Sequence, residues 1–176
     1  MNLRNIQNKR GFLLGEETIK IIIGLIVIIL LVVFLANLYY SKVKEEKQKQ
    51  AFSSLNGSNL IQGQINLINM GGQPAAGGIR IEVPVGWHIF AFTGNEIKPN
   101  VCVGENCLCI CSEVVGFNLI DWTNKRERQA GECDEDGACL VVRNLIGNYK
   151  DSIEIESGGT QIVFKSDANS ISVTKI

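Results

Sequence analysis

The six cysteines are the residues of this chain whose type and spacing could carry chemistry. They fall in the pattern Cys-x4-Cys-x-Cys-x-Cys, then Cys-x5-Cys, at Cys102, Cys107, Cys109, Cys111, Cys133 and Cys139. Zinc ribbons usually present two C-x2-4-C pairs; Cys102 and Cys107 fall within that range, but no second pair accompanies them. An even, clustered set is typical of disulfides in an oxidising compartment, so we expect disulfides and no metal site.

The spacing of Cys107, Cys109 and Cys111 restricts the pairing. In a strand these three side chains point to one face, while Leu108 and Ile110 point to the other. Neighbouring cysteines on that face have Cα atoms about 6.6 Å apart with parallel Cβ vectors, so they should not bond one another. Each must therefore pair with Cys102, Cys133 or Cys139. Six of the fifteen connectivities remain, and none contains Cys133–Cys139.

Two further groups of residues could form a site. His88 is the only histidine and lies in an aromatic-rich segment, Trp87 to Thr93, that predicts a strand. No serine or cysteine can be assigned to it as a nucleophile from the sequence. The acidic run Glu132–Asp136 could be a calcium loop, but it lacks a closing glutamate, so a solvated loop is preferred. We expect no catalytic residue, no cofactor and no enzymatic activity.

The charge balance also excludes one class of partner. From Phe52 onward there are nine Lys/Arg and fourteen Asp/Glu, so the difference 9 − 14 gives a net charge of −5. A surface that binds phosphates normally carries the opposite sign. Nucleic acid is therefore not an expected partner.

An apolar segment near the N-terminus precedes the cysteine-bearing domain and must position it. Ile21 to Ala36 contains no polar side chain, and the four residues to Tyr40 extend it to twenty. Twenty helical residues span about 30 Å, the thickness of the bilayer's hydrocarbon core. The segment predicts one transmembrane helix, with membrane lipid as a partner. Lys and Arg nearly balance on its two sides, so the cysteines decide the orientation: the N-terminus is cytoplasmic and the C-terminal domain extracytoplasmic.

The residues before this helix form a motif. A short basic leader ends in Lys9-Arg10-Gly11, Phe12 follows, and Glu16 is the fifth residue counted from Phe12. This resembles the class III signal peptide of type IV prepilins and their archaeal relatives. The resemblance covers about the first forty residues. It implies that a prepilin peptidase cuts between Gly11 and Phe12 and that the apolar helix is kept.

The resemblance also implies a role for Glu16. In that family this carboxylate sits within the bundle of apolar helices and meets the amino group of a neighbouring subunit, which pairs an otherwise costly charge. Glu17 and Lys20 depart from the family's more apolar start. Glu16 and Lys20 are spaced i,i+4 and could instead pair within one helix.

The rest of the chain predicts a helical stalk and a β-rich domain. Ser41 to Ser54 should continue the helix until Asn56-Gly57. Alternating or aromatic-rich segments predict strands, with the last three forming a meander: 60–70, 79–83, 87–93, 107–111, 152–156, 160–165 and 170–174. The stretches at 114–122 and 140–146 are also apolar, and Trp87 and Trp122 should be core residues.

The expected fold is thus an N-terminal transmembrane α-helix with a helical stalk and a mainly antiparallel, disulfide-stapled β domain. The expected organisation is a leader at 1–11, a helix at 12–55 and an extracytoplasmic domain at 56–176. The segment from Gly86 to Cys139 is similar to uncharacterised secreted domains on archaeal membrane-anchored proteins. A pilin-like structural or surface-interaction protein, which binds copies of itself or pilin-like partners, is the first hypothesis. A binding module that never polymerises is the second, and a membrane-tethered enzyme is the third.

Overall fold

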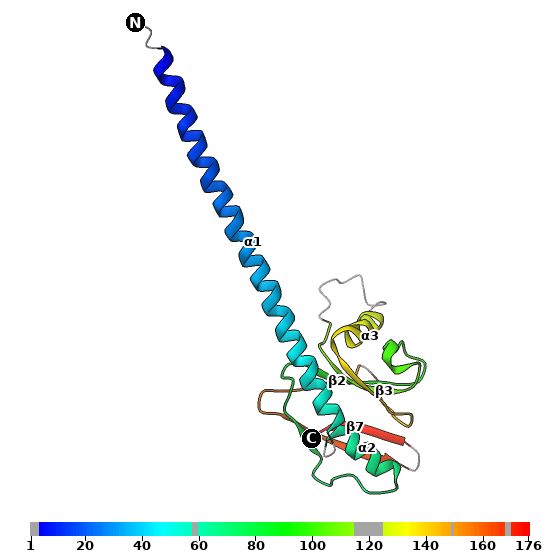
Figure 1. Cartoon of the computed structure of the whole chain (residues 1–176). Coiled ribbons are helices and arrows are strands. Elements are labelled where there is room, and N and C mark those ends of the chain that lie inside the picture. Colours follow the sequence, from blue (N-terminus) through cyan, green and yellow to red (C-terminus); the bar gives the residue numbers. More distant parts are fainter. Residues whose placement is uncertain (1–3, 58–59, 115–124, 149, 168–169) are drawn as a thin grey trace. The chain divides into compact units, whose positions relative to one another are not determined.

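The chain consists of one long N-terminal helix and a C-terminal β-rich part, seen in a computed structural model (Figure 1). The structure describes residues 4–57, 60–114, 125–148, 150–167 and 170–176, with side chains from Thr18 onward. It divides into two compact units, and the second unit begins at Lys44 and runs to Ile176. We call this second unit the C-terminal unit.

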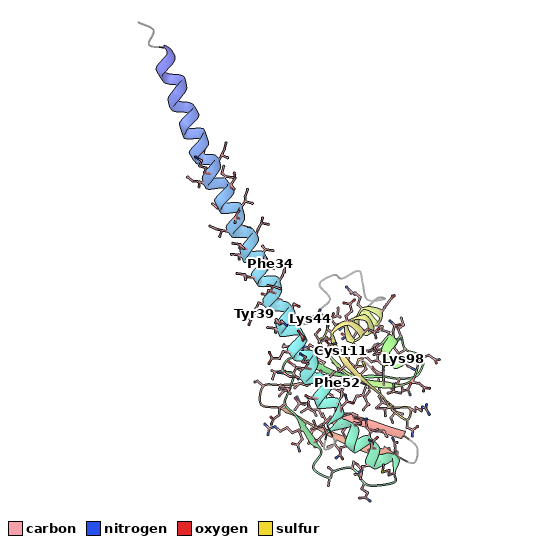
Figure 2. All side chains as sticks on the ribbon, viewed as in Figure 1. Phe34, Tyr39, Lys44, Phe52, Lys98 and Cys111 are labelled. Carbon is pink, nitrogen blue, oxygen red and sulfur yellow. A yellow bond between two sulfur atoms is a disulfide. The ribbon has the colours of Figure 1, made fainter. Side chains whose placement is uncertain are left out.

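Helix α1 spans Arg4–Asn56. Every side chain from Ile21 to Leu35 is apolar and exposed, and Phe34 and Tyr39 project outward from the helix (Figure 2). Among the described residues, this is the one helix long and apolar enough to cross a membrane. Such a fully apolar surface is stable in lipid, where a helix satisfies its own backbone hydrogen bonds. The helix ends at Asn56, which confirms the stop predicted from Asn56-Gly57.

The last turns of α1 belong to the C-terminal unit. Ala51 and Leu55 have no exposed surface and lie in its main apolar core, and Ser54 beside them is also buried. A helix that is exposed and apolar at one end therefore contributes directly to a folded core at the other.

Helix α2 (Ile61–Asn69) replaces a predicted strand. The expectation of a strand over Leu60–Met70 was wrong. The buried residues of α2 are Ile61, Ile65 and Ile68, and their spacing of four and three residues places them on one face of a helix. This face packs into the same core as Leu55, so tertiary packing selects the helical period over the partial alternation.

A four-stranded antiparallel sheet carries the cysteines. Its order is β4 (Ala138–Val141), β3 (Cys107–Cys111), β2 (His88–Phe92) and β5 (Ile153–Glu154). Helix α3 (Lys125–Asp136) and the short 3₁₀ helix η1 (Asn100–Cys102) contact β3 and β4. The strands expected at 107–111 and near 87–93 are confirmed.

A second antiparallel sheet has the order β1 (Ile79–Ile81), β6 (Thr160–Asp167) and β7 (Ser170–Lys175). The pairing of β6 with β7 confirms part of the expected meander, but the turn residues Ala168 and Asn169 lie outside the described residues. The expectation that the strand at 152–156 continues this meander was wrong, because β5 pairs with β2 of the other sheet. Backbone bonds between Ile155 and both Trp87 and Gly86 hold it there.

The two faces of the four-stranded sheet belong to different cores. Ile89, Leu108 and Ile110 pack with α1, α2 and the second sheet. Phe90, Phe92 and the cysteines form a separate cluster with Ala130 of α3. Trp87 is buried in the larger core, as expected, while the corresponding expectation for Trp122 falls outside the described residues. The mainly antiparallel, disulfide-stapled fold predicted from the sequence is confirmed.

Candidate functional site

All six cysteines meet on one face of β3. Cys102 of η1 bonds to Cys107, Cys139 of β4 to Cys109, and Cys133 of α3 to Cys111, and no cysteine is free. The Cα–Cα distances are 6.0, 4.1 and 5.1 Å in that order, within or near the usual range for disulfides. Every cysteine of β3 bonds outside its own strand, which confirms the expectation that Cys107, Cys109 and Cys111 do not bond one another.

The same geometry explains why Cys133 and Cys139 do not pair. Residues 125–136 form α3, so the expectation of an acidic loop over Glu132–Asp136 was wrong. Cys133 on the inner face of α3 reaches Cys111, while Cys139 lies beyond the helix in β4. The residue next to the helix end, Gly137, has no space for a side chain: a Cβ there would lie 2.6 Å from the Cys133 carbonyl oxygen and 2.8 Å from Cys111 Cβ.

Three of the acidic residues at the end of α3, Glu132, Asp134 and Asp136, contact another element. Carboxylates at a helix C-terminus oppose the helix dipole, so they need partners elsewhere. Asp134 accepts hydrogen bonds from the backbone N–H groups of Asn100 and Val101 at 2.7 and 3.0 Å and caps η1. Glu132 accepts a hydrogen bond from the Ser112 hydroxyl. These contacts are structural: each carboxylate binds a different part of the chain, and the carboxylates do not converge on one point.

The last acidic residue of α3, Asp136, forms an ion pair with Lys44 of α1. The hydrogen bond to Asp136 raises the pKa of Lys44; burial opposes this, and the charges of Asp136, Glu132 and Glu135 add to it. One turn along α1, Gln48 donates to the carbonyl oxygen of Gly137 at 3.3 Å. The segment that follows Cys133 is therefore held both by the Cys111–Cys133 bond and by α1.

Two disulfides come into contact on this face. The sulfur atoms of Cys107 and Cys109 are 3.8 Å apart, and those of Cys102, Cys107 and Cys109 all lie within 4.8 Å of one another. A metal would require thiolates. Sulfur atoms already shared in disulfides do not supply them, so the arrangement acts as a covalent staple between η1, β3 and β4.

His88 lies at the edge of this cluster. Its Nε2 atom is 3.5 Å from Glu113 Oε2, and Glu113 also pairs with Lys125 at 3.2 Å. The residue opposite His88 in the sheet is Cys111, whose sulfur is bonded to Cys133. Within the described residues this arrangement supplies a network of polar contacts and no activated nucleophile.

A second feature was not found from the sequence. Between β2 and β3, Val103 has a φ angle of 51° and a ψ angle of 36°, in the left-handed region that β-branched residues rarely adopt, and it is 84% exposed. The neighbouring Val101 is also exposed. Only the dipeptide Val103-Gly104, beside a cysteine, marks this turn in the sequence.

The predicted processing and assembly residues remain predictions. The backbones of Gly11, Phe12 and Glu16 lie within the bounds of α1, but their side chains lie outside the described residues. Among the described side chains, the candidate residues that the structure brings together are the cysteines.

Comparison with known proteins finds no matching family model, no matching curated protein and no matching solved structure.

Proposed function

We propose that this chain is a pilin-like structural or surface-interaction protein, anchored in the cell membrane by α1 with its C-terminal unit outside the cytoplasm. One observation carries the proposal: a single helix exposes only apolar side chains from Ile21 to Leu35 and then buries Ala51 and Leu55 in a folded domain. The helix that would enter the membrane is thus part of the domain it displays.

Three disulfides support the extracytoplasmic placement, because such bonds persist in oxidising compartments. The basic leader before Phe12 supports processing by a prepilin peptidase, since an ordinary signal peptide would lose the apolar segment. After such processing, Glu16 would lie near the new amino terminus, where it could pair with a neighbouring copy.

The first experiment concerns processing. Intact-mass measurement of the membrane-extracted protein should show a chain that starts at Phe12 and retains the helix. The matched control is Gly11→Leu, which removes the small residue at the cleavage site and should leave the leader attached. A native chain that starts at Met1, or one that lacks Ile21–Ala36, contradicts this part of the proposal.

The second experiment separates assembly from simple display. Negative-stain microscopy of the processed protein should show filaments if the chain polymerises. Dispersed particles would instead favour the alternative, a membrane-anchored binding module that does not polymerise. We rank an enzymatic function last, because the buried cysteines are disulfide-bonded and His88 is paired with Glu113.

A further inference from the structure

The end of helix α1 carries a sequence motif that the proposed function does not use. Residues Asn56-Gly57-Ser58 have the pattern Asn-x-Ser, the acceptor motif for N-linked glycans. No other asparagine in the sequence is followed at the second position by serine or threonine. Ser58 lies outside the described residues and is known by its place in the sequence. The motif belongs to the C-terminal unit, which the proposed function places outside the cytoplasm.

The acceptor side chain, Asn56, is partly exposed at the last residue of α1. Its Nδ2 group donates a hydrogen bond to the Phe52 carbonyl oxygen at 3.2 Å. An amide nitrogen of this kind carries two hydrogens, so a sugar on Nδ2 replaces one and leaves the other for Phe52. Helix ends fray, which frees Asn56 from this bond during transfer of the sugar. The folded helix end can therefore hold a glycosylated Asn56.

The middle residue of the motif, Gly57, has no room for a side chain. A Cβ there would lie 2.6 Å from Leu60 Cδ1. The Leu60 N–H also donates to the Gly57 carbonyl oxygen at 3.0 Å, which keeps the residue before α2 close to the end of α1. A glycine at this position thus keeps Asn56 beside α2.

A groove lies where α1 ends and α2 runs (Figure 1), and we call it the α2 groove. Its volume is about 480 Å³. Besides Asn56 it is lined by two amide side chains, a glycine and two apolar side chains: Gln62, Asn66, Gly63, Leu67 and Met70. None of these residues carries a charge. A neutral sugar has hydroxyl groups at its edge and C–H groups on its face, so it suits a lining of amides and apolar side chains.

We propose that Asn56 is N-glycosylated and that the first sugars of the glycan lie in the α2 groove. The proposal rests on the extracytoplasmic placement in the proposed function. The sugar donor is an oligosaccharide linked to a lipid phosphate. A bond forms between Asn56 Nδ2 and the C1 carbon of the first sugar, and the bond from C1 to the phosphate oxygen breaks. Nδ2 loses one proton, and the lipid phosphate leaves with the electron pair.

This position of the glycan has a consequence for Met70. Met70 is 85% exposed in the bare chain, and sugars in the α2 groove would cover it. The sequence contains two methionines, Met1 and Met70, and cleavage after Gly11 removes the first. Oxidation of methionine in the processed chain therefore reports on Met70 alone.

Mass spectrometry of protein extracted from its native membranes tests the modification. The peptide that contains Asn56 should carry the mass of hexose or N-acetylhexosamine residues. Asn56→Gln and Ser58→Ala should each lose all of this added mass, while Ser58→Thr preserves the motif and should keep it. The matched control is Asn66→Gln, which changes an amide of the same groove outside any acceptor motif and should keep it too. No added mass at Asn56, or added mass that persists in Asn56→Gln, overturns the proposal.

Oxidation with hydrogen peroxide tests where the glycan lies. Conversion of Met70 to methionine sulfoxide should be severalfold slower in the wild type than in Ser58→Ala. Ser58→Thr should behave as the wild type does. If Met70 oxidises at the same rate in all three proteins, the glycan does not lie in the α2 groove and that part of the proposal is overturned.

Protease protection and disulfide mapping of the same membranes distinguish this proposal from the proposed function. A C-terminal unit that lies outside and contains its three disulfides, but carries no added mass at Asn56, overturns glycosylation and leaves the proposed function standing. A C-terminal unit that is protected inside and lacks disulfides overturns both. Added mass at Asn56 that is lost in Ser58→Ala supports both.

Discussion

Cys109 of β3 lies directly opposite Cys139 of β4, with their Cα atoms 4.1 Å apart. A close pair of this kind is typical of non-hydrogen-bonded positions in antiparallel strands, where facing side chains approach each other most closely. The register that aligns β3 with β4 therefore also aligns the two sulfurs. Strand pairing and disulfide formation support each other at this point.

The disulfide prediction follows from this register. Peptide mapping under non-reducing conditions should recover Cys102–Cys107, Cys109–Cys139 and Cys111–Cys133. Replacing Cys109 and Cys139 together by alanine should lower the free energy of unfolding by about 2–4 kcal/mol. The Cys102–Cys107 disulfide closes a much shorter loop than Cys109–Cys139. The matched double variant at Cys102 and Cys107 should therefore lower the free energy of unfolding by less. A Cys133–Cys139 peptide would contradict the structure.

A second prediction compares two glycines. Gly137→Ala should destabilise the C-terminal unit by about 1–3 kcal/mol, because a Cβ there meets the Cys133 carbonyl oxygen and Cys111 Cβ. Gly131→Ala, in the middle of α3 with nothing within 4 Å of the new Cβ, should instead stabilise by about 0.5–1 kcal/mol. Denaturant unfolding of both variants measures the difference. Equal effects at the two positions would show that the space around Gly137 is not restricted.

The third prediction concerns the dependence of stability on pH. Because the pKa of Lys44 is raised in the folded protein, its pair with Asp136 contributes fully below the ordinary lysine value of 10.5. The contribution is lost as the pH rises through the folded value. Lys44 is about half exposed, so the contribution should be below about 1 kcal/mol.

Denaturant unfolding of the wild type and Lys44→Met tests this at about pH 8 and about pH 11.5. The difference in unfolding free energy should be present at the lower pH and shrink at the higher one. Asp136→Asn should remove the same dependence, since it leaves Lys44 without its partner charge. A difference that is constant or grows with pH would contradict the assignment of the pair.

The fourth prediction tests the role that the resemblance assigns to Glu16. Glu16→Ala should reduce the number of filaments while leaving the disulfide pattern and thermal midpoint of the C-terminal unit unchanged. Lys20→Ala is the matched control, because it removes the alternative i,i+4 partner without touching Glu16. If Glu16→Ala assembles normally, the family's assembly role does not apply to this chain.

The sequence predicted best where one local period decides the structure. Cys107, Leu108, Cys109, Ile110 and Cys111 alternate strictly, so strand, sulfur face and pairing rule followed from a period of two. The same reasoning failed at residues 60–70, where short apolar spacing fits either a strand or a helix. There the isoleucines of α2 pack beside Leu55, a contact between elements that the local pattern does not contain.

The acidic end of α3 shows a second reason for failure. The acidic run Glu132–Asp136 was expected to be a solvated loop, and carboxylates at a helix C-terminus do oppose the helix dipole. Contacts with Lys44 and with the backbone at Asn100 stabilise it as a helix. The position of β5 likewise depends on its pairing with β2, which is distant in sequence. The exposure of Val103 follows from one left-handed backbone conformation that the sequence does not indicate.

The disulfide pattern also sets how the folded chain would bear a pulling force. When the chain is pulled between α1 and the C-terminus, the shortest covalent path runs through the Cys102–Cys107 disulfide and then through the Cys109–Cys139 disulfide. The loop with Val103 and the whole of α3 lie on covalent side branches of that path. Sheet β1-β6-β7 has no such bypass, so its strands bear the load directly, while the branch that carries Val103 bears none of it.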